Sequence, residues 1–166
     1  MTRRGLLLTI TEPPLAMEEE FNAWYDTEHL AERLAIPGFR SARRWVMDCP
    51  PGQGKYLATY ELDSLAVLNS PEYLKYFNNQ SPWSRRCLGK AVVFRRWACE
   101  QVDPGDADPH PGARAIAFST VEASILGALQ KRRFAASAGE TIVLQELGDG
   151  RIAPPHGVLI YRAYIP

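Results

Sequence analysis

The sequence 19-EEFNAWYDTEHLAERLAIPGF-39 decides how the rest of the chain is organised. It carries aromatic and carboxylate side chains at helical spacing and ends at Pro37-Gly38, a pair that stops a helix and starts a turn. The run upstream, 5-GLLLTITE-12, is β-prone and meets Pro13-Pro14, which suits the entry to a helix. We therefore predict a strand over 5–12 and a helix over about 15–35.

The apolar residues of this helix predict which side lies on a sheet. At about 100° per residue, Met17, Phe21, Trp24 and Ala31 share one broad face of a regular α-helix. We expect that face to cover a sheet, with Phe21 and Trp24 buried against it.

The first hundred residues continue with strands and capped helices. Residues 39–47 and 55–62 alternate in character with the period of a strand, and a turn rich in proline and glycine separates them. Ser70-Pro71 and Ser81-Pro82 each join a capping serine to a proline suited to the first turn of a helix. Residues 90–102 are again β-rich. The order β-α-β-β-α-β is that of a ferredoxin-like α+β unit.

The remaining sequence predicts a partial second unit. Residues 103–112, DPGDADPHPG, have the composition of a linker. After it we expect a strand over 113–121, a helix over about 122–137, and two strands over 140–147 and 157–165. The predicted domains are thus a unit over 1–102, the linker over 103–112, and a β-α-β-β repeat over 113–166. The sequence leaves open whether the repeat completes a barrel within the chain or serves dimerisation.

Composition places the chain among soluble globular proteins and narrows its partners. Hydrophobic residues make up 46% of the chain, charged residues make up 23%, and the formal net charge is zero. No global field attracts nucleic acid or an anionic membrane, and no run approaches the roughly 20 apolar residues of a membrane helix. We expect a small-molecule ligand, and neither nucleic acid nor a membrane, as partner.

The cysteines and the N-terminus favour a cytoplasmic protein. Cys49, Cys87 and Cys99 are widely spaced, without the spacing of a zinc site, so reduced thiols are expected. The first ten residues superficially resemble a signal peptide, but their apolar run is short and leads into Glu12-Pro13-Pro14.

His29 is the only histidine on a predicted helix or strand. In a regular helix, Tyr25, His29 and Glu32 lie on one stripe, where a histidine tuned near neutrality could act as a general base. A structural contact with Glu28 or Glu32 explains the same spacing. Asp26, Glu28 and His29 diverge around the helix, so we predict no metal site.

A second candidate group lies on the strand predicted at 39–47. Ser41, Arg43 and Trp45 face one way, which suits a pocket for a flat, partly anionic ligand and equally suits a dimer interface. Because the sequence has no glycine-rich phosphate-binding motif and no serine-hydrolase motif, we expect no nucleotide cofactor and, more broadly, no cofactor.

Residues 20–39 resemble the EthD-like branch of the dimeric α+β barrel superfamily, and the resemblance extends over about residues 3–102. Seven residues carry it: Phe21, Trp24, Tyr25, Glu28, His29, Pro37 and Gly38. The family often has a proline soon after the histidine, where this chain has Leu30-Ala31-Glu32. The resemblance implies two ferredoxin-like sheets forming a barrel across a homodimer, a cavity between sheet and helices, and a role for His29.

These observations lead to a first hypothesis of function. We expect a cofactor-independent enzyme that removes a proton next to a carbonyl of a small hydrophobic or aromatic substrate, as a cyclase, dehydratase, isomerase or decarboxylase does. His29, Tyr25 and Glu28 are the candidate catalytic residues. The candidate substrate-binding residues are Trp24, Arg43, Trp45 and Tyr60. A non-catalytic binding protein is the alternative, and a haem-handling protein is third. An enclosed cavity of about 300 Å³ or more reached by His29 would favour the enzyme, and a packed interior without a cavity would favour the binding protein.

Overall fold

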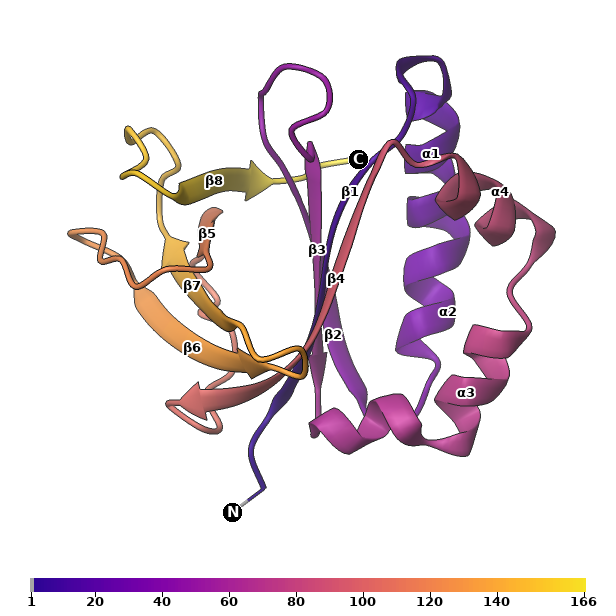
Figure 1. The fold of residues 1–166 in the computed structure, drawn as a ribbon, viewed down its shortest axis with the longest axis horizontal. Coiled ribbons are helices and arrows are strands. Elements are labelled where there is room, and N and C mark those ends of the chain that lie inside the picture. Colours follow the sequence, from indigo (N-terminus) through magenta and orange to yellow (C-terminus); the bar gives the residue numbers. More distant parts are fainter. Residues whose placement is uncertain (1) are drawn as a thin grey trace.

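The computed structural model describes residues 2–166, and its strands form one closed antiparallel β-barrel. Around the barrel the strands follow the order β1-β3-β2-β8-β5-β7-β6-β4. The first half of the chain contributes β1 (Gly5–Glu12), β2 (Phe39–Val46), β3 (Tyr56–Leu62) and β4 (Val93–Asp103). The second half contributes β5 (Ala115–Ser119), β6 (Gln130–Ala136), β7 (Thr141–Leu147) and β8 (Val158–Ala163). The helices gather on one side of the barrel (Figure 1).

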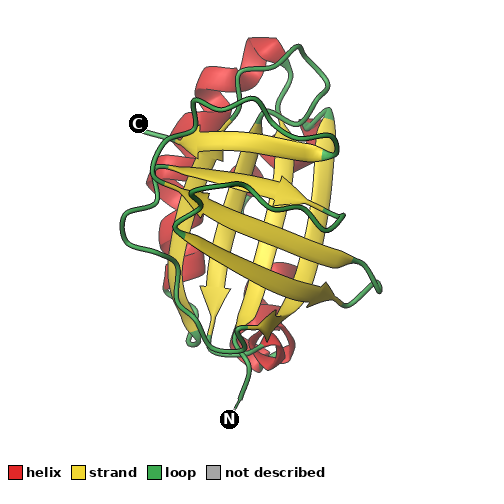
Figure 2. Ribbon diagram, turned by 90° about the vertical axis from the view of Figure 1, so that its left-hand side faces the viewer, coloured by secondary structure: helices red, strands yellow, loops and turns green. Residues whose placement is uncertain are grey.

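The expected fold class, a ferredoxin-like α+β unit of the dimeric α+β barrel type, is wrong. The barrel closes within a single chain, because β2 pairs with β8 and β4 pairs with β6. Figure 2 shows the strands of the second half crossing in front of those of the first half at a steep angle. The second half therefore supplies half of one barrel, and the description as a dimeric barrel does not apply.

The predicted helix over about 122–137 is also wrong, since part of this range forms β6. Within β6, Arg132, Phe134 and Ala136 are buried and the residues between them are more exposed, which is the period-two pattern of a strand. The alanines, leucine, glutamine and lysine of 126–136 favour a helix by intrinsic propensity. Pairing with β4 on one side and β7 on the other outweighs that preference.

The strands β1 and β3 are buried along their whole length. One face of each strand lines the barrel interior, where Leu6 and Leu8 lie, and the other face lies under the helices, where Leu7 and Tyr60 lie. A sheet covered on both faces within one chain leaves no open face to attract a second copy. The expected homodimer stays a prediction, but its interface would have to lie elsewhere.

The helical layer consists of short segments. The first is η1 (Leu15–Met17), α1 (Glu18–Trp24), the π-helical turn η2 (Tyr25–His29) and α2 (Leu30–Leu34); the second is η3 (Leu65–Asn69), α3 (Pro71–Asn78) and α4 (Pro82–Lys90). The predicted serine caps are confirmed, because the side chain of Ser70 accepts from Tyr73 N–H and that of Ser81 accepts from Ser84 N–H. None of the described helices has the length and apolar composition needed to cross a membrane.

A β-bulge in β2 changes which side chains share a face. The pairing of β2 with β3 shifts register between Phe39 and Ser41. Phe39 consequently packs in the helix-side cluster with Val46, whereas Trp45 packs inside the barrel. The predicted alignment of Phe39 with Trp45 on one face is interrupted at that point.

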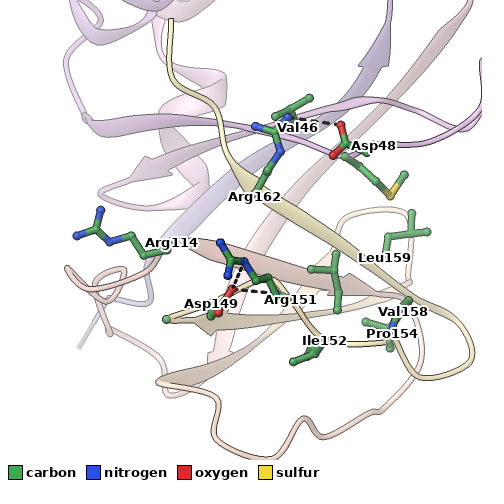
Figure 3. Close-up of a pocket in the computed structure, with 14 residues that line it drawn as sticks. Val46, Asp48, Arg114, Asp149, Arg151, Ile152, Pro154, Val158, Leu159 and Arg162 are labelled. Atoms are coloured by element: carbon green, nitrogen blue, oxygen red, sulfur yellow. Dashed lines mark hydrogen bonds and ion pairs between the residues drawn. The ribbon is translucent and has the colours of Figure 1, made fainter.

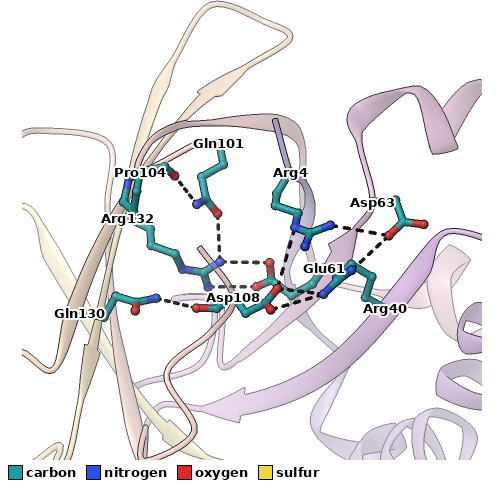
Figure 4. Close-up of polar contacts among 9 residues, drawn as sticks. All are labelled: Arg4, Arg40, Glu61, Asp63, Gln101, Pro104, Asp108, Gln130 and Arg132. Carbon is teal, nitrogen blue, oxygen red and sulfur yellow. Dashed lines mark hydrogen bonds and ion pairs between the residues drawn. The ribbon is translucent and has the colours of Figure 1, made fainter. Parts of the chain in front are cut away.

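The barrel interior is mostly apolar but holds one buried ionic cluster (Figure 4). Arg132 donates to Glu61 through both terminal nitrogens, at 3.0 and 2.9 Å, and to Glu146 at 2.7 Å. The Oε1 atom of Gln101 accepts a further bond from Arg132 at 3.3 Å. All four residues are at most 5% exposed, so the cluster fixes the register of β3, β4, β6 and β7 relative to one another.

Candidate functional site

A small chamber lies between the helical layer and the outer face of the sheet. Its volume is about 40 Å³. Residues from β1, β3 and the first helical segment form its deep end: Leu7, Thr9, Tyr25, His29, Arg33 and Tyr60. The chamber thus lies where helix and sheet meet, outside the barrel itself.

The π-helical turn determines which residues of the helix face this chamber. A π turn inserts one extra residue, which rotates everything after it by about 100° relative to a regular α-helix. Ala31, predicted on the apolar face, is therefore exposed, whereas Arg33 is turned inward and is only 6% exposed. Such turns occur frequently at functional sites, and this one contains the YDTEH run.

His29 is held by aromatic side chains on several sides. Its ring stacks on that of Trp24 with centroids 4.3 Å apart and meets the ring of Tyr25 edge-on at 4.9 Å. The histidine is 4% exposed. Its Nδ1 lies 3.3 Å from the hydroxyl oxygen of Tyr76 on α3. These contacts leave the ring with one orientation relative to the chamber.

Burial keeps His29 neutral. Desolvation comes first, followed by the charges of Arg33 and Arg44, and together they hold the pKa of His29 well below its usual 6.5. The sequence alone left two opposing effects, nearby carboxylates and burial, and burial prevails. A neutral imidazole has one nitrogen free to accept a proton.

A hydrogen-bond relay connects His29 to Glu32. The hydroxyl of Tyr76 donates to Glu32 Oε2 at 2.8 Å, and burial first of all raises the pKa of Tyr76, so the phenol keeps its proton. Because that single proton goes to the carboxylate, His29 Nδ1–H donates to the phenolic oxygen. This tautomer leaves Nε2 as the proton acceptor.

Arg33 has no acidic partner among residues 2–166. Its Nε and Nη1 atoms are buried, and their N–H groups donate to no partner in the described structure. Its guanidinium carbon lies 4.8, 5.4 and 5.9 Å from the ring centroids of Tyr76, Tyr73 and Tyr60. These three rings offset part of the cost of burying the charge but leave two N–H donors unsatisfied.

Two further polar groups complete the deep end. The hydroxyl of Tyr60 donates to that of Tyr25 at 3.4 Å, and burial raises the pKa of Tyr60 well above its usual value. The hydroxyl of Thr9 is buried and has no partner in the described structure. The chamber therefore offers free donors on Arg33 and Thr9 beside a neutral histidine.

A larger groove of about 420 Å³ lies directly outside the chamber. Five residues line both spaces and form the partition between them: Phe77, Gln80, Leu88, Phe94 and Arg96. The chamber, which His29 lines, is far smaller than the roughly 300 Å³ that favours an enzyme. The groove exceeds that size by itself, but His29 is not among the residues that line it. Phe77 and Phe94 are 45% and 49% exposed, so these two rings can move without disrupting the core.

The structure separates the predicted catalytic residues. His29 and Tyr25 line the chamber. Glu28 instead accepts a bond of 2.9 Å from the Ser81 hydroxyl at the start of α4, so it anchors a helix. Of the predicted substrate-binding residues, Tyr60 lines the chamber, whereas Trp24 lies behind His29 and donates to Ser84 Oγ at 3.1 Å.

Arg43 and Trp45 lie away from this site. Trp45 belongs to the barrel interior and donates to Thr59 Oγ1 at 3.2 Å. The guanidinium of Arg43 lies over the ring of Trp45 and donates to the carbonyl of Ala113 at 2.9 Å. The two residues do lie together, as their alternation predicts, but on the opposite face of the sheet from His29.

Another groove, of about 510 Å³, lies near β8 and the 148–154 loop (Figure 3). Four of its five charged residues form two largely exposed pairs, Arg162 with Asp48 and Arg151 with Asp149, and the fifth is Arg114. Exposed pairs contribute little energy and impose little orientation. Nor do the described residues contain a group of histidine, cysteine and acidic side chains arranged for a metal ion. The chamber is therefore the better candidate site.

No family model matches the chain. An 80-residue stretch is 35% identical to a protein named Core atranone cluster (CAC) protein 1 from Stachybotrys chlorohalonatus (strain IBT 40285). The match covers 47% of this chain and 34% of that relative. The chain thus spans about a third of the relative it matches, and the printed name states no activity. The resemblance to EthD-like proteins stays a prediction.

Four residues of the site were missed from the sequence: Thr9, Arg33, Tyr76 and Arg96. Arg33 was missed because only the π turn brings it inward, and no local signal marks that turn. Tyr76 and Arg96 come from elements distant in sequence. The apolar face of 71–78 was recognised, but nothing in it indicates that one tyrosine meets His29.

Proposed function

We propose that the chamber and its outer groove bind a small hydrophobic or aromatic carbonyl compound, and that His29 removes a proton from the carbon next to the carbonyl. The observation that carries this proposal is the neutral, buried His29, oriented by Tyr76 and Glu32 and placed beside the unpaired Arg33. A general base needs an unprotonated nitrogen and a fixed aim.

The reaction is written with the residues of the site. His29 Nε2 takes the proton, the electron pair of the broken C–H bond forms a carbon–carbon double bond, and the negative charge moves to the carbonyl oxygen. Arg33 and the Thr9 hydroxyl supply positive potential and a donor for that charge. Return of the proton to the enolate oxygen gives the enol, a keto–enol isomerisation and the simplest outcome, and leaves His29 neutral again.

The assignment of roles differs from the sequence-based hypothesis in two places. Tyr76 and Glu32 orient the base, in place of Glu28, because Glu28 is bonded to Ser81. Arg33 steadies the developing charge in place of Arg43, because Arg43 lies on the barrel side of the sheet. Tyr25 packs edge-on against His29 and acts as its support.

Exchange of carbon-bound hydrogen for deuterium tests the proposal. The protein is incubated in deuterated buffer with phenylpyruvate and with 1-phenylpropan-2-one, and loss of the α-proton signals is followed by NMR. We expect exchange above the buffer rate, lost in His29→Gln and retained in the loop variant His156→Gln. Absence of exchange in every ketone tried, or equal exchange in His29→Gln, would refute the enzymatic role.

Binding without exchange would support the alternative of a non-catalytic binding protein. One observation favours that alternative: the pKa of His29, held down first by burial, makes it a weak base in the empty site. The exchange experiment separates the two, because a binding protein shifts the resonances of the ligand while leaving its α-protons in place.

A further inference from the structure

The buried guanidinium of Arg33 is the least compensated charge at the site. A charge removed from water without an ionic partner is unfavourable, and the three surrounding tyrosine rings recover only part of that cost. Elsewhere in the interior the chain pairs its arginines, as Arg44 with Asp26 at 2.9 Å and Arg132 with two glutamates. Arg33 departs from that pattern: two of its nitrogens have no partner among the described residues, and its side chain lines the chamber.

The surroundings of Arg33 favour a negative charge. Arg96 also lines the chamber and donates to the Tyr73 hydroxyl at 2.9 Å. The one nearby carboxylate, Glu32, is engaged by Tyr76. The unpartnered hydroxyl of Thr9 lines the same small space. Two arginines and a free hydroxyl therefore face a volume that no carboxylate of the described residues occupies.

We propose that Arg33 and Thr9 form a subsite for the carboxylate group of the ligand, whose apolar part lies in the outer groove beside Phe77 and Phe94. This inference rests on the proposed function and adds the substrate class: a hydrophobic or aromatic 2-oxo acid, whose carboxylate adjoins the reacting carbonyl so that Arg33 and Thr9 serve both groups. The two free nitrogens of Arg33, Nε and Nη1, lie on different edges of the guanidinium, so each can donate a hydrogen bond of its own, one to the carboxylate and one to an adjoining carbonyl oxygen.

Size and polarity distinguish this ligand from others. The chamber has a volume of about 40 Å³, little more than the share of liquid volume of one water molecule, which is about 30 Å³. It therefore accepts a carboxylate group and is too small for a phosphate group together with the protein donors that would surround it. The groove outside is lined by half-exposed aromatic rings. A small anionic head joined to a flat apolar body matches both spaces.

Paired ligands test the subsite directly. The dissociation constants of 2-naphthoate, benzoate and phenylacetate are measured by calorimetry against those of the corresponding neutral amides, near neutral pH. We expect the wild-type protein to prefer each acid to its amide. Arg33→Met should reduce that preference by about 10- to 100-fold, and Thr9→Val, which removes only a hydroxyl, by about 2- to 10-fold. Arg162→Met, which changes an exposed arginine of β8 that lines neither the chamber nor the outer groove, should leave it within about 3-fold of the wild type.

Binding of the amides by each variant shows that the groove has kept its shape. If Arg33→Met binds neither acid nor amide, Thr9→Val decides, because a threonine-to-valine change at a hydroxyl without a partner leaves the packing intact. The proposal is overturned if the wild-type protein binds none of the acids at millimolar concentration, if it prefers the amides, or if Thr9→Val leaves the preference unchanged.

The outcome is separable from that of the proposed function. A preference for acids that depends on Arg33, together with no deuterium exchange, would refute the enzymatic role and support the carboxylate subsite. Deuterium exchange that depends on His29, together with no preference for acids, would support the enzymatic role and refute the carboxylate subsite.

Discussion

Replacing Arg132 with methionine is expected to destabilise the barrel strongly, and more at neutral than at acid pH. The substitution keeps most of the side-chain volume but removes the cation that is bonded to both Glu61 and Glu146. Figure 4 draws Arg132 with Glu61. Two carboxylates, both at most 5% exposed, then face each other without a counter-charge. Breaking a buried pair in this way costs about 3–5 kcal/mol.

The structure also gives the pH dependence. One proton on either carboxyl group restores the original net charge of the cluster. From a usual glutamate pKa of 4.5, that proton costs about 4 kcal/mol at about pH 7.5 and about 1.4 kcal/mol at about pH 5.5, at 1.36 kcal/mol per pH unit. The sign follows from Glu61. Burial already raises its pKa, and loss of Arg132 raises it further, so the folded variant binds more protons than the unfolded chain and loses stability as pH rises.

Urea denaturation at these two pH values measures the effect. The matched control is Arg133→Met, because the next residue of β6 points outward and pairs with Asp103 and Glu122 at the surface. We expect a small change for the control at both pH values. Equal losses for the two variants, or a loss in Arg132→Met that is independent of pH, would refute the assignment of Arg132 as the buried counter-charge.

Three further predictions concern the helical layer. Trp24→Ala should lower the free energy of unfolding by about 3–5 kcal/mol, because the Trp24 side chain is fully buried on the inner face of α1. A loss under about 1 kcal/mol in chemical denaturation would contradict that packing. Below about pH 6.5 the wild-type protein should lose stability, because His29 takes up a proton in the unfolded chain but not in the folded one, where its pKa is lowered. His29→Gln should abolish this loss. The expected slope is at most about 1.4 kcal/mol per pH unit, and identical slopes in the two proteins would count against a neutral His29. Ser81→Ala should cost about 1 kcal/mol, measured in urea, because Ser81 caps α4 and also donates to Glu28; an unchanged midpoint would mean that the cap contributes nothing.

The strands were largely predictable because their signals are local. The alternation at 55–62, the proline pair after 5–12 and the glycine turns between strands place β1, β3 and their neighbours within a few residues of the observed bounds. Barrel closure was not predictable, since it depends on pairings such as Trp45 with Ala163 and Cys99 with Ala136, which join residues far apart in sequence. The same distant pairing turns a segment of helical composition into β6.

The site was predictable in part for the same reason. His29 and Tyr25 were identified because their spacing on the helix places them side by side, and the structure brings both to the chamber with Tyr60. The roles expected for Glu28 and Arg43 failed, because each is engaged by an element that folds back from elsewhere: Ser81 in one case and the carbonyl of Ala113 in the other. The place of Arg33 in the site could not be predicted, because it depends on a π turn that no residue type in the sequence indicates.

The most direct test of the account is an NMR pH titration of the ring protons of the three histidines, with His29→Gln used to assign the resonance of His29. We expect His29 to stay neutral well below pH 6.5 in the free protein. When 2-naphthoate is added, the resonance of His29 should move and those of His110 and His156 should not. We also expect the pKa of His29 to rise in the complex with 2-naphthoate, because the carboxylate offsets the charge of Arg33. A His29 that titrates above pH 6.5 in the free protein, or one whose resonance is unaffected by the bound acid, would contradict the assignment of the chamber as the functional site.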